Sequence, residues 1–332
     1  MTHKVSSLSS IDEVLNLNIT NLILFNSYDS IIMKKTTACF LLLLLSSCAP
    51  QETPLMPINL DTGINGNDTG IQTKATDTEF ETNDRIGLYV VNFVDGVAGN
   101  LASSNNHVNN MGFTFDISTD PKWTPDEEIF WFDGATNADF YCYYPFTATV
   151  EDVSSFPFII NSNQSVLANY KSSDFLWGNK TGIAPTSSPV PVLLSHCFSL
   201  MKIILEAGEG FTEDDLIANN VSIGINNIKN NALIDLSDGV VTASGSTVTI
   251  SPYYTGTFYK ALAVPQSIAN GTNLLTINVG GINYYFSIGT ALAFESNKIY
   301  TFTITLSKTG SGITIGINPW EDDGNDYGGN AS

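Results

Sequence analysis

Short runs of alternating apolar and polar residues dominate the chain after about residue 74, and they predict β-strands. In the run 86–91, Ile86, Leu88 and Val90 fall on alternate positions, which indicates a strand with one buried face. The run 300–306 alternates apolar residues with threonines in the same way. Hardly any segment has the period of a long amphipathic helix, so the pattern predicts an all-β protein.

Turn-forming pairs separate these runs at the short intervals of a β-meander or Greek key. They are Asp95–Gly96, Asp133–Gly134, Asp238–Gly239, Gly280–Gly281, and Asn-Asn and Ser-Gly pairs between residues 221 and 250. Strands are also expected at 112–118, 127–132, 138–146 and 156–164, and a turn or short helix within 166–177. The apolar run 191–210 favours two strands or one long one, with a helix as the alternative, because periodicity cannot separate short buried strands from helices.

The acidic, glycine-containing segment 208–215 is the expected domain boundary. It divides the chain into an N-terminal β-sandwich over 74–207 and a C-terminal one over 208–322, with about seven strands in each. A polar tail, 323–332, follows. Before residue 74, the Pro-, Asn-, Asp- and Gly-containing segment 49–73 predicts a tether with one short strand.

Residues 33–48 have the organisation of a bacterial export signal. Two lysines, Lys34 and Lys35, precede an apolar run at 39–45 that is too short to cross a bilayer. The last four residues, ending in Cys48, have the pattern of a lipobox, which predicts a lipid on the Cys48 thiol. The alternative is a signal peptide without lipid. We expect residues 1–32 not to belong to the native protein; the alternative is a long leader or an extra helix.

The charge and residue composition of the chain restrict the kinds of molecule that it could bind. The formal net charge is −20, which argues against nucleic acid or an anionic membrane surface as a partner. Charged residues make up only 14% of the chain, and the abundant neutral polar and aromatic residues are typical of an extracellular β protein. Since no second apolar span follows Cys48, the lipid is the only membrane anchor we expect.

Few residues suggest catalysis or metal binding. His107 lies in a polar loop, and His196 lies in an apolar run that favours a core histidine over a catalytic or metal-binding one. Cys142 and Cys197 also lie in apolar runs, which favours two free core cysteines over one disulfide. The motifs of zinc proteases, serine hydrolases and phosphate-binding loops are missing from the sequence. We therefore expect no catalytic residue, cofactor or metal.

Carboxylate clusters and tryptophans leave two further alternatives open. The clusters at 126–128, 213–215 and 321–326 fit solvated turns better than calcium sites, because they lack the spacing of a calcium loop. Trp123, Trp131, Trp177 and Trp320 could form sugar-stacking platforms, but in strands such residues usually belong to the core.

Several runs occur together in an order that resembles a known family. They are DRIGLYVV at 84–91, DFYCYYPF at 139–146, NQS and SDFLWG within 163–178, LSHCFSLMKIIL at 194–205, AVPQSI at 263–268, and YTFTITL before a final INPW. The chain resembles the fimbrillin-like lipoproteins of Bacteroidales, which are the pilins and accessory subunits of type V pili. The resemblance covers essentially all of the chain after residue 74.

The resemblance implies two tandem transthyretin-like β-sandwich domains and assembly by donor-strand exchange. In that family a trypsin-like protease cuts after an arginine and removes the first strand, and a strand from another subunit fills the groove. Carried onto this chain, the removable strand lies within 55–71 and the cut falls at Lys74, where lysine departs from the usual arginine. Arg85 lies inside a strand pattern and is a poor alternative. The implied donor segment contains Ile313, Ile315 and Ile317, unless this is simply the chain's own last strand.

The leading hypothesis is therefore a non-enzymatic pilus subunit on the cell surface, located in the outer membrane through its lipid or in the fimbrium, and contributing to adhesion. Its partners would be other pilus subunits and a surface receptor or glycan. The short tail would suit an accessory, tip or anchor subunit at least as well as a stalk subunit. The alternative is a monomeric glycan-binding lipoprotein. A glycosidase is the third hypothesis, and it would need two carboxylates converging in a cleft.

Overall fold

The computed structural model describes residues 55–65, 79–217, 220–308 and, by their backbone, 310–319. The expectations for residues 1–54, for Lys74 and for the tail lie outside these ranges. The described residues from 55 to 319 belong to one compact unit. Nearly all of the regular secondary structure in the described part is β-strand, which confirms the all-β prediction.

In the described ranges the strands are accompanied by two short helices, α2 (Leu167–Lys171) and the 3₁₀-helix η1 (Glu213–Leu216). In chain order the strands are β1 (Leu60–Ile64), β2 (Arg85–Asn92), β3 (Val108–Phe115), β4 (Trp123–Pro125), β5 (Ala138–Tyr144), β6 (Phe156–Ile159), β7 (Leu176–Ile183), β8 (Val190–His196), β9 (Ser199–Ala207), β10 (Val221–Ile234), β11 (Val241–Ile250), β12 (Tyr253–Tyr254), β13 (Tyr259–Ala263), β14 (Ser267–Ile268), β15 (Asn273–Val279), β16 (Ile282–Ser287), β17 (Leu292–Ala293), β18 (Lys298–Ser307) and β19 (Gly310–Pro319).

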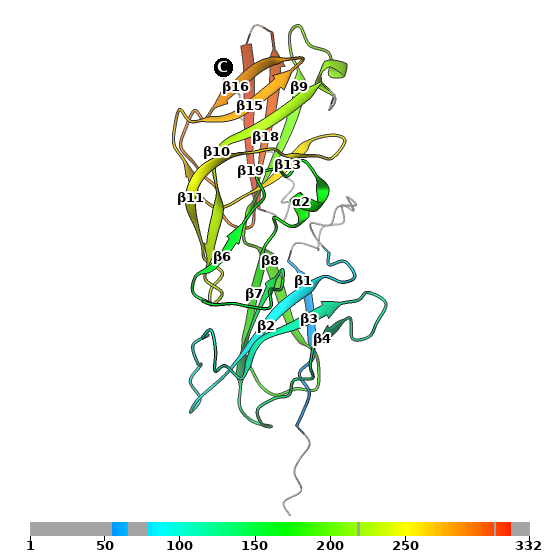
Figure 1. The fold of residues 1–332 in the computed structure, drawn as a ribbon, viewed down its shortest axis with the longest axis vertical. Helices are drawn as coiled ribbons and strands as arrows, with labels where there is room; N and C mark the ends of the chain where they lie inside the picture. Colours follow the sequence, from blue (N-terminus) through cyan, green and yellow to red (C-terminus); the bar gives the residue numbers. More distant parts are fainter. Residues whose placement is uncertain (1–54, 66–78, 218–219, 309, 320–332) are drawn as a thin grey trace, which may run out of the picture. The chain divides into compact units, whose positions relative to one another are not determined.

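The first sheet has seven strands in the order β1-β8-β7-β5-β2-β3-β4 (Figure 1). Its neighbours are antiparallel except at one edge, where β1 pairs in parallel with β8. The two edge strands of this sheet are β1 and β4. An isolated bridge between Pro57, before β1, and Phe130, after β4, shows that these edges lie close together. β1 therefore closes the first sheet at the point where its ends meet.

Two five-stranded sheets and one two-stranded sheet make up the rest of the fold (Figure 1). One five-stranded sheet contains β11, β10, β15 and β16, with β6 also paired to β10. The other has the order β12-β13-β9-β18-β19, so β19 is an edge strand. β14 and β17 form the two-stranded sheet.

The first sheet is buried on both faces along its central strands. Ile86, Leu88 and Val90 of β2 belong to an apolar cluster enclosed by the first sheet. Tyr89 and Val91, on the opposite face of the same strand, belong to a larger cluster that also contains residues of both five-stranded sheets. Such strands read as nearly continuous apolar runs in the sequence.

Several local expectations are confirmed and others need correction. The run 191–210 contains two strands, β8 from its second residue and β9, and 166–177 contains a helix, as predicted. The run 127–132 was expected to be a strand but contributes only the bridge at Phe130. Sheet membership changes between β8 and β9, before the expected boundary at 208–215, because β9 pairs with β13 and β18. The division into two domains stays a prediction.

Candidate functional site

β1 fills one edge of the first sheet with alternating buried side chains. Leu60, Thr62 and Ile64 are buried, while Asp61 between them is exposed. In the parallel register these three residues pair with Val190, Val192 and Leu194 of β8, which are also buried. The period of two thus places one face of β1 in the core of the first sheet.

The backbone of the β1 region is bonded on both sides. Toward β8, the Val190 amide donates to the Asn59 carbonyl at 2.8 Å, and the Asn65 amide donates to the Leu194 carbonyl at 2.7 Å. Toward the other edge, the Ile58 amide donates to the Ile129 carbonyl at 2.9 Å. The segment 56–65 is therefore held as a strand inserted between two edges.

Side chains of the first sheet close over β1. The Trp123 indole is buried and donates to the Thr62 carbonyl at 3.1 Å. At the end of the strand, the Asn65 amide group donates to the Ser195 hydroxyl at 3.3 Å. The Thr62 hydroxyl, in contrast, is buried and has no hydrogen-bond partner among the described residues. One polar atom of the inserted strand is thus unsatisfied in an otherwise apolar position.

β19, which contains the expected donor residues, pairs with β18 along its whole length. In the antiparallel register Ile313, Ile315 and Ile317 are opposite Ile304, Phe302 and Tyr300 of β18. The β18 residues at these positions are buried. The segment is therefore the chain's own last strand in this structure, and its role as a donor stays a prediction.

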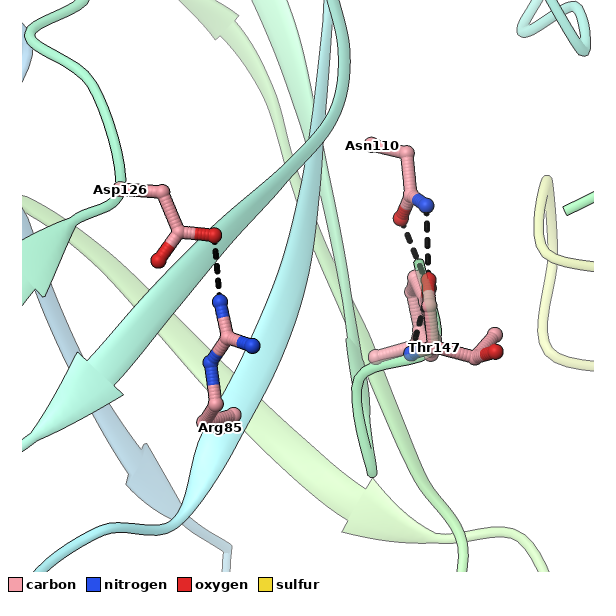
Figure 2. A network of polar contacts seen from close by, with 5 residues as sticks. Arg85, Asn110, Asp126 and Thr147 are labelled. Carbon is pink, nitrogen blue, oxygen red and sulfur yellow. Dashed lines mark hydrogen bonds and ion pairs between the residues drawn. The ribbon is translucent and has the colours of Figure 1, made fainter. Parts of the chain in front are cut away.

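A polar network lies across the first sheet, away from β1 in the strand order (Figure 2). Arg85, at the start of β2, forms an ion pair with Asp126, and its guanidinium lies 4.4 Å from the centre of the Phe146 ring. Asn110 donates to the Thr147 carbonyl at 2.8 Å. Arg85 thus lies in a strand between β3 and β5 with its side chain paired to Asp126, and which position is cleaved stays a prediction.

A small cavity of about 60 Å³ lies next to Ile64. Three of the acidic side chains that line it have partners: Glu81 pairs with Lys171 at 2.8 Å, Asp174 pairs with His196 at 2.9 Å, and Asp84 accepts from the Tyr144 hydroxyl at 3.1 Å. No group of His, Cys, Asp and Glu side chains in the described ranges could hold a metal ion. Nothing in this cavity resembles a pair of free carboxylates for glycoside hydrolysis.

The other residues singled out by sequence have structural roles. His196 is a buried core histidine, as predicted, and Cys142 and Cys197 are free and buried, as the sequence favoured. Trp123 and Trp131 belong to the core and not to a surface platform. Trp177 is half-buried and donates to the Leu236 carbonyl at 2.7 Å, whereas Trp320 and the cluster at 321–326 lie outside the described residues.

Sequence reasoning did not single out the β8 residues that receive β1. Val190, Val192 and Leu194 alternate at a period of two, and this signal could have identified β8 as a strand with one face in the core. The parallel pairing with β1 has no local signal, because the partners are more than a hundred residues apart. No helix in the part of the chain that the structure describes is long and apolar enough to cross a membrane.

Comparison with known proteins identifies the family. The family model described as fimbrillin-like matches residues 73–320. The chain belongs to the fimbrillin-like family. This fimbrillin-like chain is also 25% identical over 306 residues to a protein of Bacteroides uniformis named as a candidate fimbrium subunit, Fim1C. The alignment covers 86% of the chain and 95% of that relative.

Two crystal structures share the fold of this fimbrillin-like chain. One is a candidate cell adhesion protein of Bacteroides uniformis, with a TM-score of 0.60, 21% identity, and coverage of 80% of this chain and 98% of that one. The other is a candidate cell adhesion protein of Bacteroides ovatus, with a TM-score of 0.63, 18% identity, and coverage of 81% and 99%.

Proposed function

We propose that the chain is a fimbrial subunit of the cell surface that assembles by donor-strand exchange, with adhesion as its biological role. The observation that carries this proposal is β1, a short strand that is inserted at a sheet edge and followed by the predicted cleavage position, Lys74. Its loss would uncover both the apolar core and the backbone edge of β8. An exposed edge of this kind is a template for a strand from another chain.

Burial of apolar side chains in the inserted segment stabilises the subunit. This stabilisation favours replacement of β1 by another strand over its loss without replacement. Ile58, Leu60 and Ile64 are each at most 7% exposed. Full burial of such a side chain stabilises a protein by about 1.5–3 kcal/mol. A chain without β1 would therefore lose several kcal/mol of apolar burial, and a donor strand of similar pattern would restore it.

The limits of the family match agree with a division of the chain into a removable strand and a remaining subunit. The match begins at residue 73, after β1, and ends at residue 320, after β19. The part of the chain common to the family thus includes the expected donor strand and excludes the expected removable strand. Since β19 is an edge strand bonded on one side only, it can leave its sheet without disrupting a central strand.

Protease specificity gives the test. Arg85 is the sole arginine in the sequence, and it lies in β2, between β3 and β5. We expect an arginine-specific protease to leave the folded chain from residue 49 onward, made without the lipid-carrying Cys48, intact. A lysine-specific protease should cut at Lys74 and allow oligomers, seen by size-exclusion chromatography and intact mass.

The matched variants are Lys74→Ala, which should resist the cut and stay monomeric, and Lys74→Arg, which should become sensitive to the arginine-specific protease. A chain that is cut at position 74, releases residues 49–74 and stays monomeric at all concentrations would contradict the proposal. In the cell, we propose that Cys48 carries the lipid, so the same cut would separate the subunit from its membrane anchor.

A further inference from the structure

β1 and β19 share a sequence pattern. Residues 60–65 read Leu-Asp-Thr-Gly-Ile-Asn, and residues 313–318 read Ile-Thr-Ile-Gly-Ile-Asn. The two segments agree in their apolar first residue, in the Gly-Ile-Asn ending and in the spacing between them. At the exposed second position β1 has Asp61 and β19 has Thr314. Among the positions that face the core, the two segments change from polar to apolar only at the third, where β1 has Thr62 and β19 has Ile315.

We propose that residues 313–318 of a second copy occupy the place of residues 60–65, parallel to β8 and in the same register, and that Thr62 biases the exchange toward the incoming strand. This inference rests on the proposed function and adds to it the register, the direction and the residue that decides between the two strands. Ile313, Ile315 and Ile317 would then be opposite Val190, Val192 and Leu194.

Thr62 is the weak position of β1. Its side chain is 7% exposed, and its hydroxyl oxygen has no hydrogen-bond partner among the described residues. The residue opposite it, Val192, is fully buried and has only aliphatic side-chain atoms to offer. An unsatisfied buried hydroxyl weakens the strand, and an isoleucine there carries apolar surface instead.

The rest of the pattern is compatible with either strand. The Asn65 side chain donates to the Ser195 hydroxyl, and Asn318 takes the same position in the proposed register. The Trp123 indole donates to the carbonyl of residue 62, which any residue supplies. At Gly63 an added Cβ would meet only Leu193, at 3.8 Å, so space alone does not require the shared glycine. The third position, Thr62 against Ile315, therefore decides which strand binds more tightly.

The test uses the mature chain with a site for a sequence-specific protease inserted after Lys74. After cleavage, the fragment that contains β1 stays in place until a competitor displaces it. The competitor is a labelled peptide of residues 310–319, and its binding is measured together with the release of the fragment. Two further peptides carry Ile315→Thr, which restores the hydroxyl, and Ile315→Val, which keeps a branched aliphatic side chain.

The wild-type and Ile315→Val peptides should displace the fragment, and the Ile315→Thr peptide should bind roughly 10- to 100-fold more weakly, the effect of one unsatisfied buried hydroxyl. In a Thr62→Val host, whose side chain has nearly the same shape, the fragment should be displaced roughly tenfold less readily. The uncut Thr62→Val chain should also unfold at a higher denaturant concentration than the wild type.

The outcomes separate this inference from the proposed function. If the wild-type peptide displaces β1 but Ile315→Thr and Thr62→Val have no effect, the exchange stands and the role of Thr62 is wrong. If no peptide displaces β1 from a chain that has been cut, the proposed function fails, and this inference fails with it.

Discussion

Tyrosine side chains on the first sheet connect it to the larger apolar cluster. Tyr89, Tyr141 and Tyr143 all belong to the cluster that contains residues of both five-stranded sheets. The Tyr143 hydroxyl donates to the Asn110 side chain at 2.7 Å, whereas the buried Tyr89 hydroxyl has no partner among the described residues. Gly87 is opposite Tyr143 in the register, and an added Cβ there would collide with the Tyr143 ring. This glycine is thus required by a close approach.

The buried tyrosines predict a loss of stability in alkali. Burial raises the pKa of Tyr89 to about 12, above the value near 10 of an unfolded chain, so folding favours the protonated phenol. Its contribution is complete below pH 10 and is lost as the pH rises from 10 through about 12. The Tyr89→Phe variant should keep its stability at neutral pH and lose less between these limits. Denaturant unfolding across the alkaline range measures this; an unchanged pH dependence would contradict it.

The sequence could predict which individual residues are buried, but it could not predict their hydrogen-bond partners. The apolar runs around Cys142 and His196 indicated burial, and the structure places both in the core. The missing partner of the Thr62 hydroxyl had no signal in the sequence, since threonine is common at exposed strand positions. Only the register of β1 on β8 places it opposite Val192.

At the scale of elements, the alternation of buried and exposed residues in β1 predicts that one substitution lowers stability strongly and its neighbour's substitution hardly changes it. Leu60 is 2% exposed and packs in the first-sheet core, so Leu60→Ala should lower the free energy of unfolding by about 2–4 kcal/mol. Asp61 is its exposed neighbour, and Asp61→Ala should change stability by less than about 0.5 kcal/mol. Chemical denaturation of the uncut mature chain measures both. Equal effects would mean that β1 does not insert one face into the core.

The positions of the strands were more predictable than their ends. Glycine and asparagine residues occur both in turns, which end a strand, and in bulges, which lie inside one. Gly280 and Gly281 have φ values of 59° and 89° and form the predicted hairpin turn between β15 and β16. The Asn-Asn pair ending at Asn227, with a φ of 61°, was also expected to be a turn, but it lies inside β10 at a shift of register. Gly245 similarly lies inside β11. A positive φ therefore marks a departure from regular strand, and only long-range pairing decides which kind.

The strands that change sheets were not predictable from local pattern. β6 lies among strands of the first sheet in the sequence but pairs with β10. β8 and β9 form one apolar run, and the short link between them contains Cys197 and Phe198, both buried. Because both sides of the link are in the core, composition gives no boundary there. The acidic segment 208–215 forms a turn and the start of η1, and its role as a domain boundary stays a prediction.

At the scale of the whole molecule, charge opposes the association of identical copies. The chain has 33 acidic and 13 basic residues, and residues 1–48 contain equal numbers of each sign, so the mature chain keeps the net charge of −20. Raising the salt concentration from about 0.01 M to about 1 M shortens the screening length from about 30 Å to 3 Å. The cut chain should therefore form oligomers faster as salt rises, measured by light scattering. A rate that falls with salt would contradict association of like-charged copies.

The central claim is that a strand from a second copy takes the place of β1, and a cross-link between copies tests it most directly. Leu193 of β8 is 60% exposed and is opposite Gly63 of β1 in the register. One copy carries Leu193→Cys, and the other carries Gly316→Cys or, as the control two residues out of register on the same face, Thr314→Cys. The native Cys142 and Cys197 are buried and should not compete. The uncut double variant Gly63→Cys with Leu193→Cys serves as the positive control, since it should form a disulfide within one chain.

After cleavage at position 74, mixed copies are oxidised and analysed by mass spectrometry. We predict a disulfide between chains that links residue 193 to residue 316, with little linkage to residue 314. Absence of any link between chains after loss of residues 49–74, while the positive control forms its disulfide, would contradict the account.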